Sequence, residues 1–235
     1  ITVPSSKGFH RVAWDLTRSS KAVIPLQNTP EDAEENTRKG KMVAPGVYVA
    51  ELSKLQDGIT TSLGKPVEIV VERMRTGALE GAAPQDVADF WQELEVEAGE
   101  VQFTYSALQN ALKKVDAMQR ALAEVEVGSE DLNEKLFALR AQLDKMEIDL
   151  RGSPAKREVG EITRPTVQQR LQVANMGTAY STYGPTPMHR ENLQLARDHH
   201  QKLRERLAAI IQEDIPNLKK QLDDAGAPNI EGFWD

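Results

Sequence analysis

The sequence predicts an α+β chain in which a small antiparallel β-sandwich, residues 1–77, precedes an antiparallel bundle of three or four helices, residues 84–235. Two observations predict this division. Up to about Arg75, apolar residues alternate with polar ones in short runs separated by turns, as they do in β-strands. From Pro84 onward, apolar residues recur every three or four positions, as they do along one face of a helix.

The β part is predicted from runs of alternating residues. These runs cover residues 9–17, 47–55 and 67–71. In the first run the apolar set is Val12, Trp14 and Leu16, so we expect these side chains to face a core. Asp57-Gly58 is a strong signal for a hairpin turn. Several short strands with turns between them favour an antiparallel sandwich.

The helical part is predicted from apolar stripes. The expected helices cover residues 85–126, 130–150, 165–176 and 187–225. Gly99 lies inside the first of them and predicts a bend or a close contact with another helix. Helices of this kind joined by turns typically form an antiparallel bundle.

Prolines and glycines predict the helix boundaries. Pro165 is expected at the first position of the third helix. Thr186 is expected to cap the fourth helix, with Pro187 at its first position. Pro216 lacks a backbone N–H and predicts a kink, and Gly226 is typical of a helix C-terminus.

Composition excludes several classes of function. The net charge is −7, and residues 84–235 hold 18 Lys and Arg against 26 Asp and Glu, which disfavours nucleic acid as a partner. No stretch of about 18 apolar residues predicts a membrane span. The chain has no Cys, which excludes disulfides, thiolate nucleophiles and cysteine-based metal sites.

A search for catalytic motifs predicts no catalytic residue, no cofactor and no metal site. His189 and His200 are about 16 Å apart if they lie on one helix, too far for one metal ion. The nucleophile elbow Gly-x-Ser-x-Gly, a phosphate-binding loop and a dinucleotide fingerprint are missing. No pair of carboxylates stands out from the acidic residues on the polar faces of the helices.

The most unusual stretch is the connection between the third and fourth expected helices. We select it as a candidate interaction surface, because Tyr combines an apolar ring with a polar hydroxyl. Its candidate residues are Tyr180, Thr182, Tyr183, His189 and Arg190. The alternative is a structural connection whose tyrosines pack on the neighbouring helices.

Several motifs resemble a known family. Those of the β part are residues 8–16 (GFHRVAWDL) and 44–48 (APGVY). They are similar to the FlgD-type Ig-like module that follows sortilin-like, BNR-repeat β-propellers in bacterial exported proteins, which are often labelled glycosyl hydrolases. Motifs of the helical part resemble the helical region that follows this module in such proteins. They are Pro165-Thr166, Arg170-Leu171, Gly184-Pro185-Thr186-Pro187, His189-Arg190 and Asp214-Ile215-Pro216.

The resemblance implies an exported, periplasmic or extracellular protein. It implies an accessory region without catalytic activity that spaces or docks the propeller of the same parent chain, or binds a protein or a carbohydrate. Only residues 1–7 precede the first motif, so we expect an incomplete sandwich. One alternative is that the parent is a glycoside hydrolase and the loop at residues 178–190 helps to shape its substrate cleft. Another is a periplasmic adaptor with a long helical hairpin.

Overall fold

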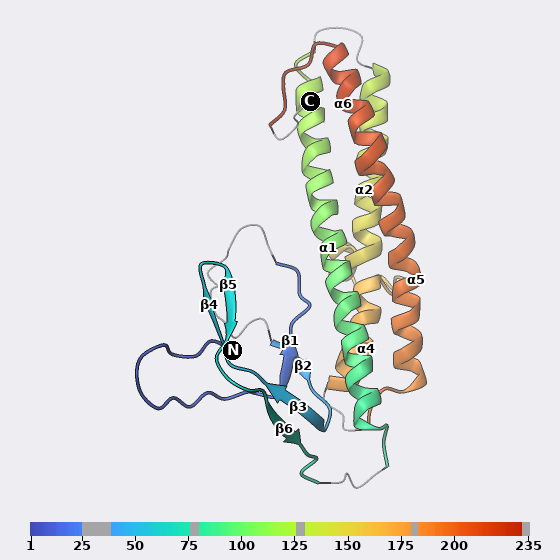
Figure 1. The fold of residues 1–235 in the computed structure, drawn as a ribbon. Coiled ribbons are helices and arrows are strands. Elements are labelled where there is room, and N and C mark those ends of the chain that lie inside the picture. The colour runs from blue at the N-terminus through green and yellow to red at the C-terminus, as the bar shows by residue number, and fades with distance from the viewer. Residues whose placement is uncertain (25–38, 76–79, 126–129, 180–182, 232–235) are drawn as a thin grey trace.

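The computed structural model describes residues 1–24, 39–75, 80–125, 130–179 and 183–231. It is an α+β structure with small antiparallel sheets and a few long helices. The long helices lie side by side in an elongated helical body, and the strands gather beside one end of it (Figure 1). We call residues 1–75 the β module and α1, α2, α4, α5 and α6 together the helical body.

The strands of the β module pair in two-stranded antiparallel ladders. Their bounds are β1 Thr17–Ser19, β2 Lys39–Met42, β3 Gly46–Ala50, β4 Ser53–Gln56, β5 Ile59–Ser62 and β6 Val67–Val71. The pairs are β1 with β2, β3 with β6, and β4 with β5. Among the described residues these ladders do not join into one sheet, so the predicted sandwich is not confirmed.

The hairpin predicted at Asp57-Gly58 is confirmed. These two residues join β4 to β5, where Gln56 pairs with Ile59. Both have a positive φ, 50° at Asp57 and 78° at Gly58, as the tight turn of a two-residue hairpin requires. The last predicted strand is also confirmed as β6.

The strand predicted over residues 9–17 is wrong. Only β1 forms here, and it begins at Thr17. Leu16 has a φ of 61°, which breaks the extended backbone just before β1. Val12 and Leu16 are exposed, and Trp14 is half-buried. The Trp14 ring packs edge-on against Tyr48, with ring centroids 5.3 Å apart, rather than inside a sandwich core.

The helices of the helical body are close to the predicted ones. Their bounds are α1 Pro84–Leu122, α2 Glu130–Arg151, α4 Val167–Ala179, α5 Pro187–Ala209 and α6 Ile215–Asp224, and a short α3, Pro154–Glu158, lies in the connection after α2. At 39 residues, α1 is about 58 Å long. It rises from the β module, α2 returns along its upper part, and α4 lies at its lower part (Figure 1). The run from α5 to α6 contacts α4 below and α2 above.

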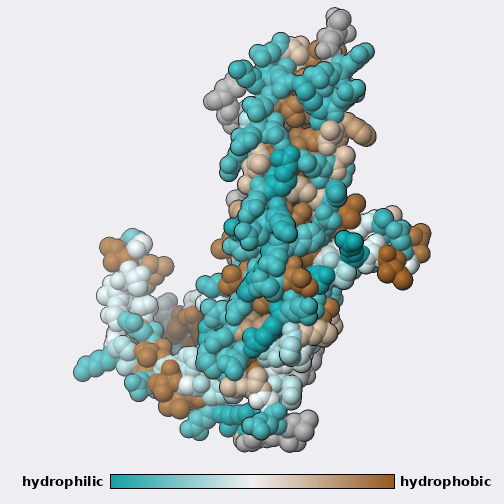
Figure 2. Space-filling view, turned by 90° about the vertical axis from the view of Figure 1, so that its right-hand side faces the viewer, coloured by the Kyte–Doolittle hydropathy of each residue, from teal (hydrophilic) through white to brown (hydrophobic). Residues whose placement is uncertain are grey.

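One continuous core joins these helices. The predicted stripes of α1, α2, α4 and α5–α6 all contribute to it, and fully buried members include Leu108, Val115, Leu136, Leu143 and Ile210. The face of the helical body in Figure 2 is mostly hydrophilic. The periodicity of the sequence therefore identified the packed faces correctly.

The start of α4 differs by two residues from the prediction. Val167, and not Pro165, is the first helical residue. The Gln169 N–H donates to the Thr166 hydroxyl at 3.2 Å, and the Thr166 N–H donates to the Gln169 side-chain oxygen at 3.0 Å. This reciprocal pair is a capping box. It makes Thr166 the N-cap, so α4 begins two residues after the proline.

Just before Pro216, where a kink is predicted, the helix widens into one turn of π-helix. Residues Ile210–Asp214 form this turn between α5 and α6, and the Ile215 N–H bonds to the Ile210 carbonyl. Widening the helix here accommodates a proline that cannot donate a backbone hydrogen bond. Gly226 ends α6 with a φ of 79°, and the Ala227 N–H returns to the Leu222 carbonyl at 3.0 Å, so the predicted C-cap is confirmed.

Gly99 allows the β module to approach α1. A Cβ at this position would lie 2.7 Å from the Lys21 carbonyl oxygen. Beside it, the Lys21 N–H donates to Glu95 at 3.0 Å. The close contact at Gly99 is therefore with the chain that follows β1, and not with another helix as predicted. Within the described ranges, none of the helices combines the length and the apolar character that a membrane span needs.

Candidate functional site

The predicted interaction surface lies between α4 and α5, and its described residues have structural contacts. His189 is buried at the start of α5, where its Nδ1 accepts the Thr186 N–H at 3.2 Å. Its ring lies against Gly177 of α4, where an added Cβ would be 2.1 Å from the imidazole Nε2. His189 therefore does not present its ring to a partner.

Tyr183 and Arg190 connect the same region to α1. The Tyr183 carbonyl accepts the Ala82 N–H at 2.8 Å, two residues before α1 begins. The Arg190 guanidinium lies 5.5 Å from the centroid of the Phe90 ring. Tyr183 remains about half exposed. Tyr180 and Thr182 lie outside the described residues.

A buried polar cluster, which the sequence did not predict, crosses from α1 to α5. His200 is 3% exposed, and its Nε2 lies 2.8 Å from the Thr104 hydroxyl. Its Nδ1 lies 2.7 Å from a carboxylate oxygen of Glu97. Hydroxyl, imidazole and carboxylate are thus in the order found in a catalytic triad.

This cluster is closed to a substrate. The Thr104 side chain is 2% exposed, so no carbonyl carbon can approach its hydroxyl. A recess of about 240 Å³ outside His200 is lined by the charged residues of α1 and α5. There Arg197 pairs with Glu93 at 3.1 Å, and Arg204 pairs with Glu100 at 3.0 Å. The cluster satisfies buried polar groups and joins the two helices.

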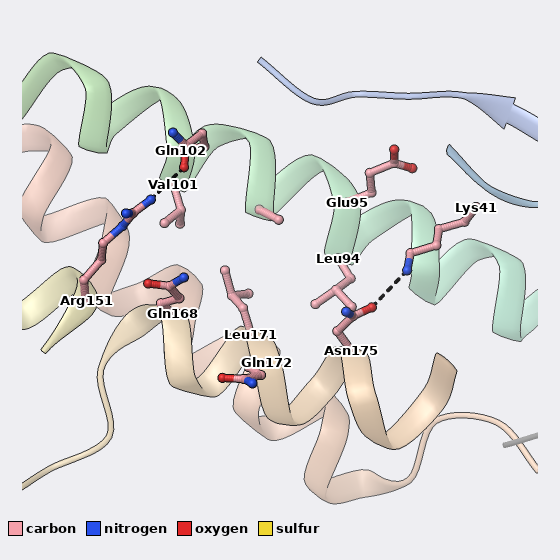
Figure 3. A pocket seen from close by; sticks show the side chains of 11 residues that line it. Lys41, Leu94, Glu95, Val101, Gln102, Arg151, Gln168, Leu171, Gln172 and Asn175 are labelled. Atoms are coloured by element: carbon pink, nitrogen blue, oxygen red, sulfur yellow. Dashed lines mark hydrogen bonds between the residues drawn. The ribbon is translucent and has the colours of Figure 1, made fainter. Parts of the chain in front are cut away.

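A polar groove of about 510 Å³ lies between α1, α4 and β2. Its floor is apolar, and polar side chains converge over it (Figure 3). The lining residues are Lys41, Leu94, Glu95, Ala98, Val101, Gln102, Arg151, Gln168, Leu171, Gln172 and Asn175. Apolar walls with a few convergent polar groups are typical of ligand sites.

Hydrogen bonds hold the two cations of the groove. The Lys41 ammonium donates to the Asn175 side-chain oxygen at 3.0 Å. The Arg151 guanidinium donates to Gln102 at 2.9 Å and lies 3.5 Å from the centroid of the Tyr105 ring. Among the described residues neither cation forms an ion pair, so both carry charge that a ligand can neutralise.

The β module exposes apolar side chains on its sheets. On one face of the β3–β6 ladder lie Val47, Val49 and Val70, each between 62% and 64% exposed. The other face carries Tyr48 and Ile69, next to Trp14. Apolar faces of this kind are normally covered in a stable sheet.

An apolar cavity of about 510 Å³ separates the β module from the start of α1. Its walls include Met42 and Val43 from one side and Val87 and Trp91 from the other. The junction between the β module and α1 therefore contains apolar space that side chains do not fill.

Sequence reasoning missed the His200 cluster and the groove for different reasons. His200 lies in the apolar stripe of α5, at helical spacing from Ala196 and Leu203. A buried histidine needs a hydrogen-bond partner, so the sequence did indicate that a polar side chain of another helix would face it. The groove combines residues from β2, α1, α2 and α4 that are up to 134 positions apart. No local pattern signals such a site.

Among the described residues, no group of three His, Cys, Asp or Glu side chains is placed to hold a metal ion. No family model, no curated protein and no solved structure matches this chain.

Proposed function

We propose that this chain is an accessory region without catalytic activity, belonging to an exported BNR-repeat β-propeller protein. In this proposal the β module is a FlgD-type Ig-like module that docks against the propeller or another β-rich domain. The helical body then acts as a spacer. The motif resemblance of residues 8–16 and 44–48 supports the family, and the structure supports the docking role.

The observation that carries the docking role is the exposed valine face of the β3–β6 ladder. Val47 and Val70 are cross-strand partners, and Val49 follows on the same face. A two-stranded ladder with such a face is only marginally stable in water by itself. Cover from a neighbouring domain would remove these three side chains from water.

The helical body supports the spacer role. Its core is continuous along α1, and the face in Figure 2 is mostly hydrophilic. A rigid element about 58 Å long can hold two partners apart at a fixed distance.

The alternatives have less support from the geometry. A role for the loop at residues 178–190 in a hydrolase cleft would use His189, which is buried between α4 and α5. An adaptor hairpin made of α1 and α2 would project freely, whereas here α6 packs against both helices.

The first test is to read the sequence encoded before Ile1 and to produce that domain separately. We expect propeller repeats that bind this chain, as measured by isothermal titration calorimetry. The double variant Val47→Thr/Val49→Thr keeps the side-chain shape and is expected to weaken binding at least tenfold. Val96→Thr on α1, where the valine is also exposed, is the matched control and is expected to bind like the original chain.

Two results would refute the proposal. One is hydrolysis of a glycoside or peptide substrate by the purified chain, which would make the region catalytic. The other is unchanged binding of the Val47→Thr/Val49→Thr variant, which would remove the valine face from the interface.

A further inference from the structure

The groove between α1, α4 and β2 has a charge pattern that the proposed function does not use. Lys41 and Arg151 lie at its two ends, with Gln168 and Gln172 between them (Figure 3). Each cation is held by a neutral amide, Asn175 at one end and Gln102 at the other. Neutral partners orient the cations without neutralising them.

The length of the groove follows from α4. Its lining residues on this helix run from Gln168 to Asn175, which are seven residues apart and therefore about 10 Å apart along the helix axis. An extended peptide advances about 3.3 Å per residue, so a peptide of about four residues covers this length.

The side chains between the ends suit a peptide backbone. Gln168 and Gln172 are exposed, and each amide can both donate and accept a hydrogen bond. Leu94, Val101 and Leu171 form the floor, which can take an apolar side chain of the ligand. Glu95, whose carboxylate accepts the Lys21 N–H, leaves a negative charge on the wall and disfavours a ligand with closely spaced anions.

We propose that this groove binds a short, extended acidic peptide in which two carboxylates flank an apolar residue. Lys41 and Arg151 bind the two carboxylates, and the amide side chains bind the peptide backbone. Lys41 belongs to β2, but no residue of the β3–β6 ladder lines the groove, so the groove does not depend on what the valine face of that ladder docks against. Failure of the proposed function would therefore leave it intact.

The test uses a fluorescently labelled peptide, acetyl-Glu-Ala-Leu-Glu-amide, and the whole chain. Fluorescence anisotropy at low ionic strength is expected to show saturable binding. The neutral peptide acetyl-Gln-Ala-Leu-Gln-amide is expected to bind at least tenfold more weakly, because it cannot form charge-assisted hydrogen bonds with Lys41 and Arg151. Equal binding of the two peptides, or no binding of either, would overturn the proposal.

Variants of the chain locate the binding. Lys41→Gln and Arg151→Gln are each expected to weaken binding of the acidic peptide about tenfold. Lys145→Gln, on an exposed part of α2 outside the groove, makes the same change in net charge and is expected to have less than a twofold effect. Circular dichroism controls for folding of the three variants. An equal loss of peptide affinity in all three variants would show that only the net charge matters, and it would contradict the proposal. Trigalacturonate is measured in the same assay. If it binds more tightly than the peptide, the groove is a site for acidic sugars and the proposal is wrong.

Discussion

The helical body and the β module use apolar residues in opposite ways. Along the helices, the apolar stripe is buried in one core, and Leu143 of α2 is fully inaccessible to water. In the β module, Leu55 of β4 and the valines of β3–β6 are mostly exposed. The comparison teaches that the helical body contains the partners that stabilise it, whereas the sheets of the β module bury little apolar surface.

The largest effect is expected from a cavity in the helical core. Leu143→Ala removes buried methyl groups and is expected to lower the free energy of unfolding by about 3 kcal/mol. Leu55→Ala makes the same chemical change on the exposed β4 strand, where we expect less than about 0.5 kcal/mol. Urea unfolding followed by helical circular dichroism measures both, and a similar loss in the two variants would break the distinction between the regions.

A contact between helices gives the second prediction. Gly177→Ala places a methyl group where the His189 ring lies, and we expect a loss of about 2 kcal/mol. In a His189→Ala background the same change is expected to stabilise the chain by up to about 1 kcal/mol, because Ala is the better helix former. The double-mutant cycle is measured by urea unfolding; equal effects in the two backgrounds would show that His189 and Gly177 do not interact.

The helical body was predictable because its signals are local. The apolar stripes, Pro187 and Gly226 each fix the helical backbone through neighbouring residues, and the Asp57-Gly58 turn of the β module was predictable for the same reason. The start of α4 was missed by two positions because Pro165 and Thr166 both signal a helix start, and only the Thr166–Gln169 capping pair decides between them. Residue preferences at helix starts do not decide the first helical residue when two neighbouring residues, here Pro165 and Thr166, both favour a helix start.

The β module was less predictable because a strand needs a partner. Residues 9–17 alternate as a strand does, yet the chain turns at Leu16 and pairs only from Thr17 onward. Likewise, the candidate residue His189 was selected for its unusual loop, but the close approach to Gly177 buries it. Burial of this kind depends on packing between segments, which sequence spacing does not describe.

The buried polar cluster gives the third prediction, with a smaller effect. Thr104→Val keeps the shape of the side chain but leaves His200 Nε2 without its hydroxyl partner. We expect a loss of about 1–2 kcal/mol, because an unsatisfied buried polar atom carries its desolvation cost. Thr104→Ser retains the hydroxyl and is expected to lose less than half as much. If Thr104→Ser loses more than Thr104→Val in urea unfolding, packing of the methyl group rather than the hydrogen bond stabilises this crossing of α1 and α5.

The smallest effect is expected where the two regions meet. Gly99→Ala adds a methyl group that would lie 2.7 Å from the Lys21 carbonyl oxygen, so the chain after β1 must move away from α1. The helix itself gains from the change by up to about 1 kcal/mol. We therefore expect urea unfolding of the helical body to be unchanged or slightly harder, while hydrogen exchange at the Lys21 amide becomes faster because its bond to Glu95 is lost. A substantial loss of helical stability would instead show that the β module supports the helices, and the two regions would then have to be treated as one cooperative unit.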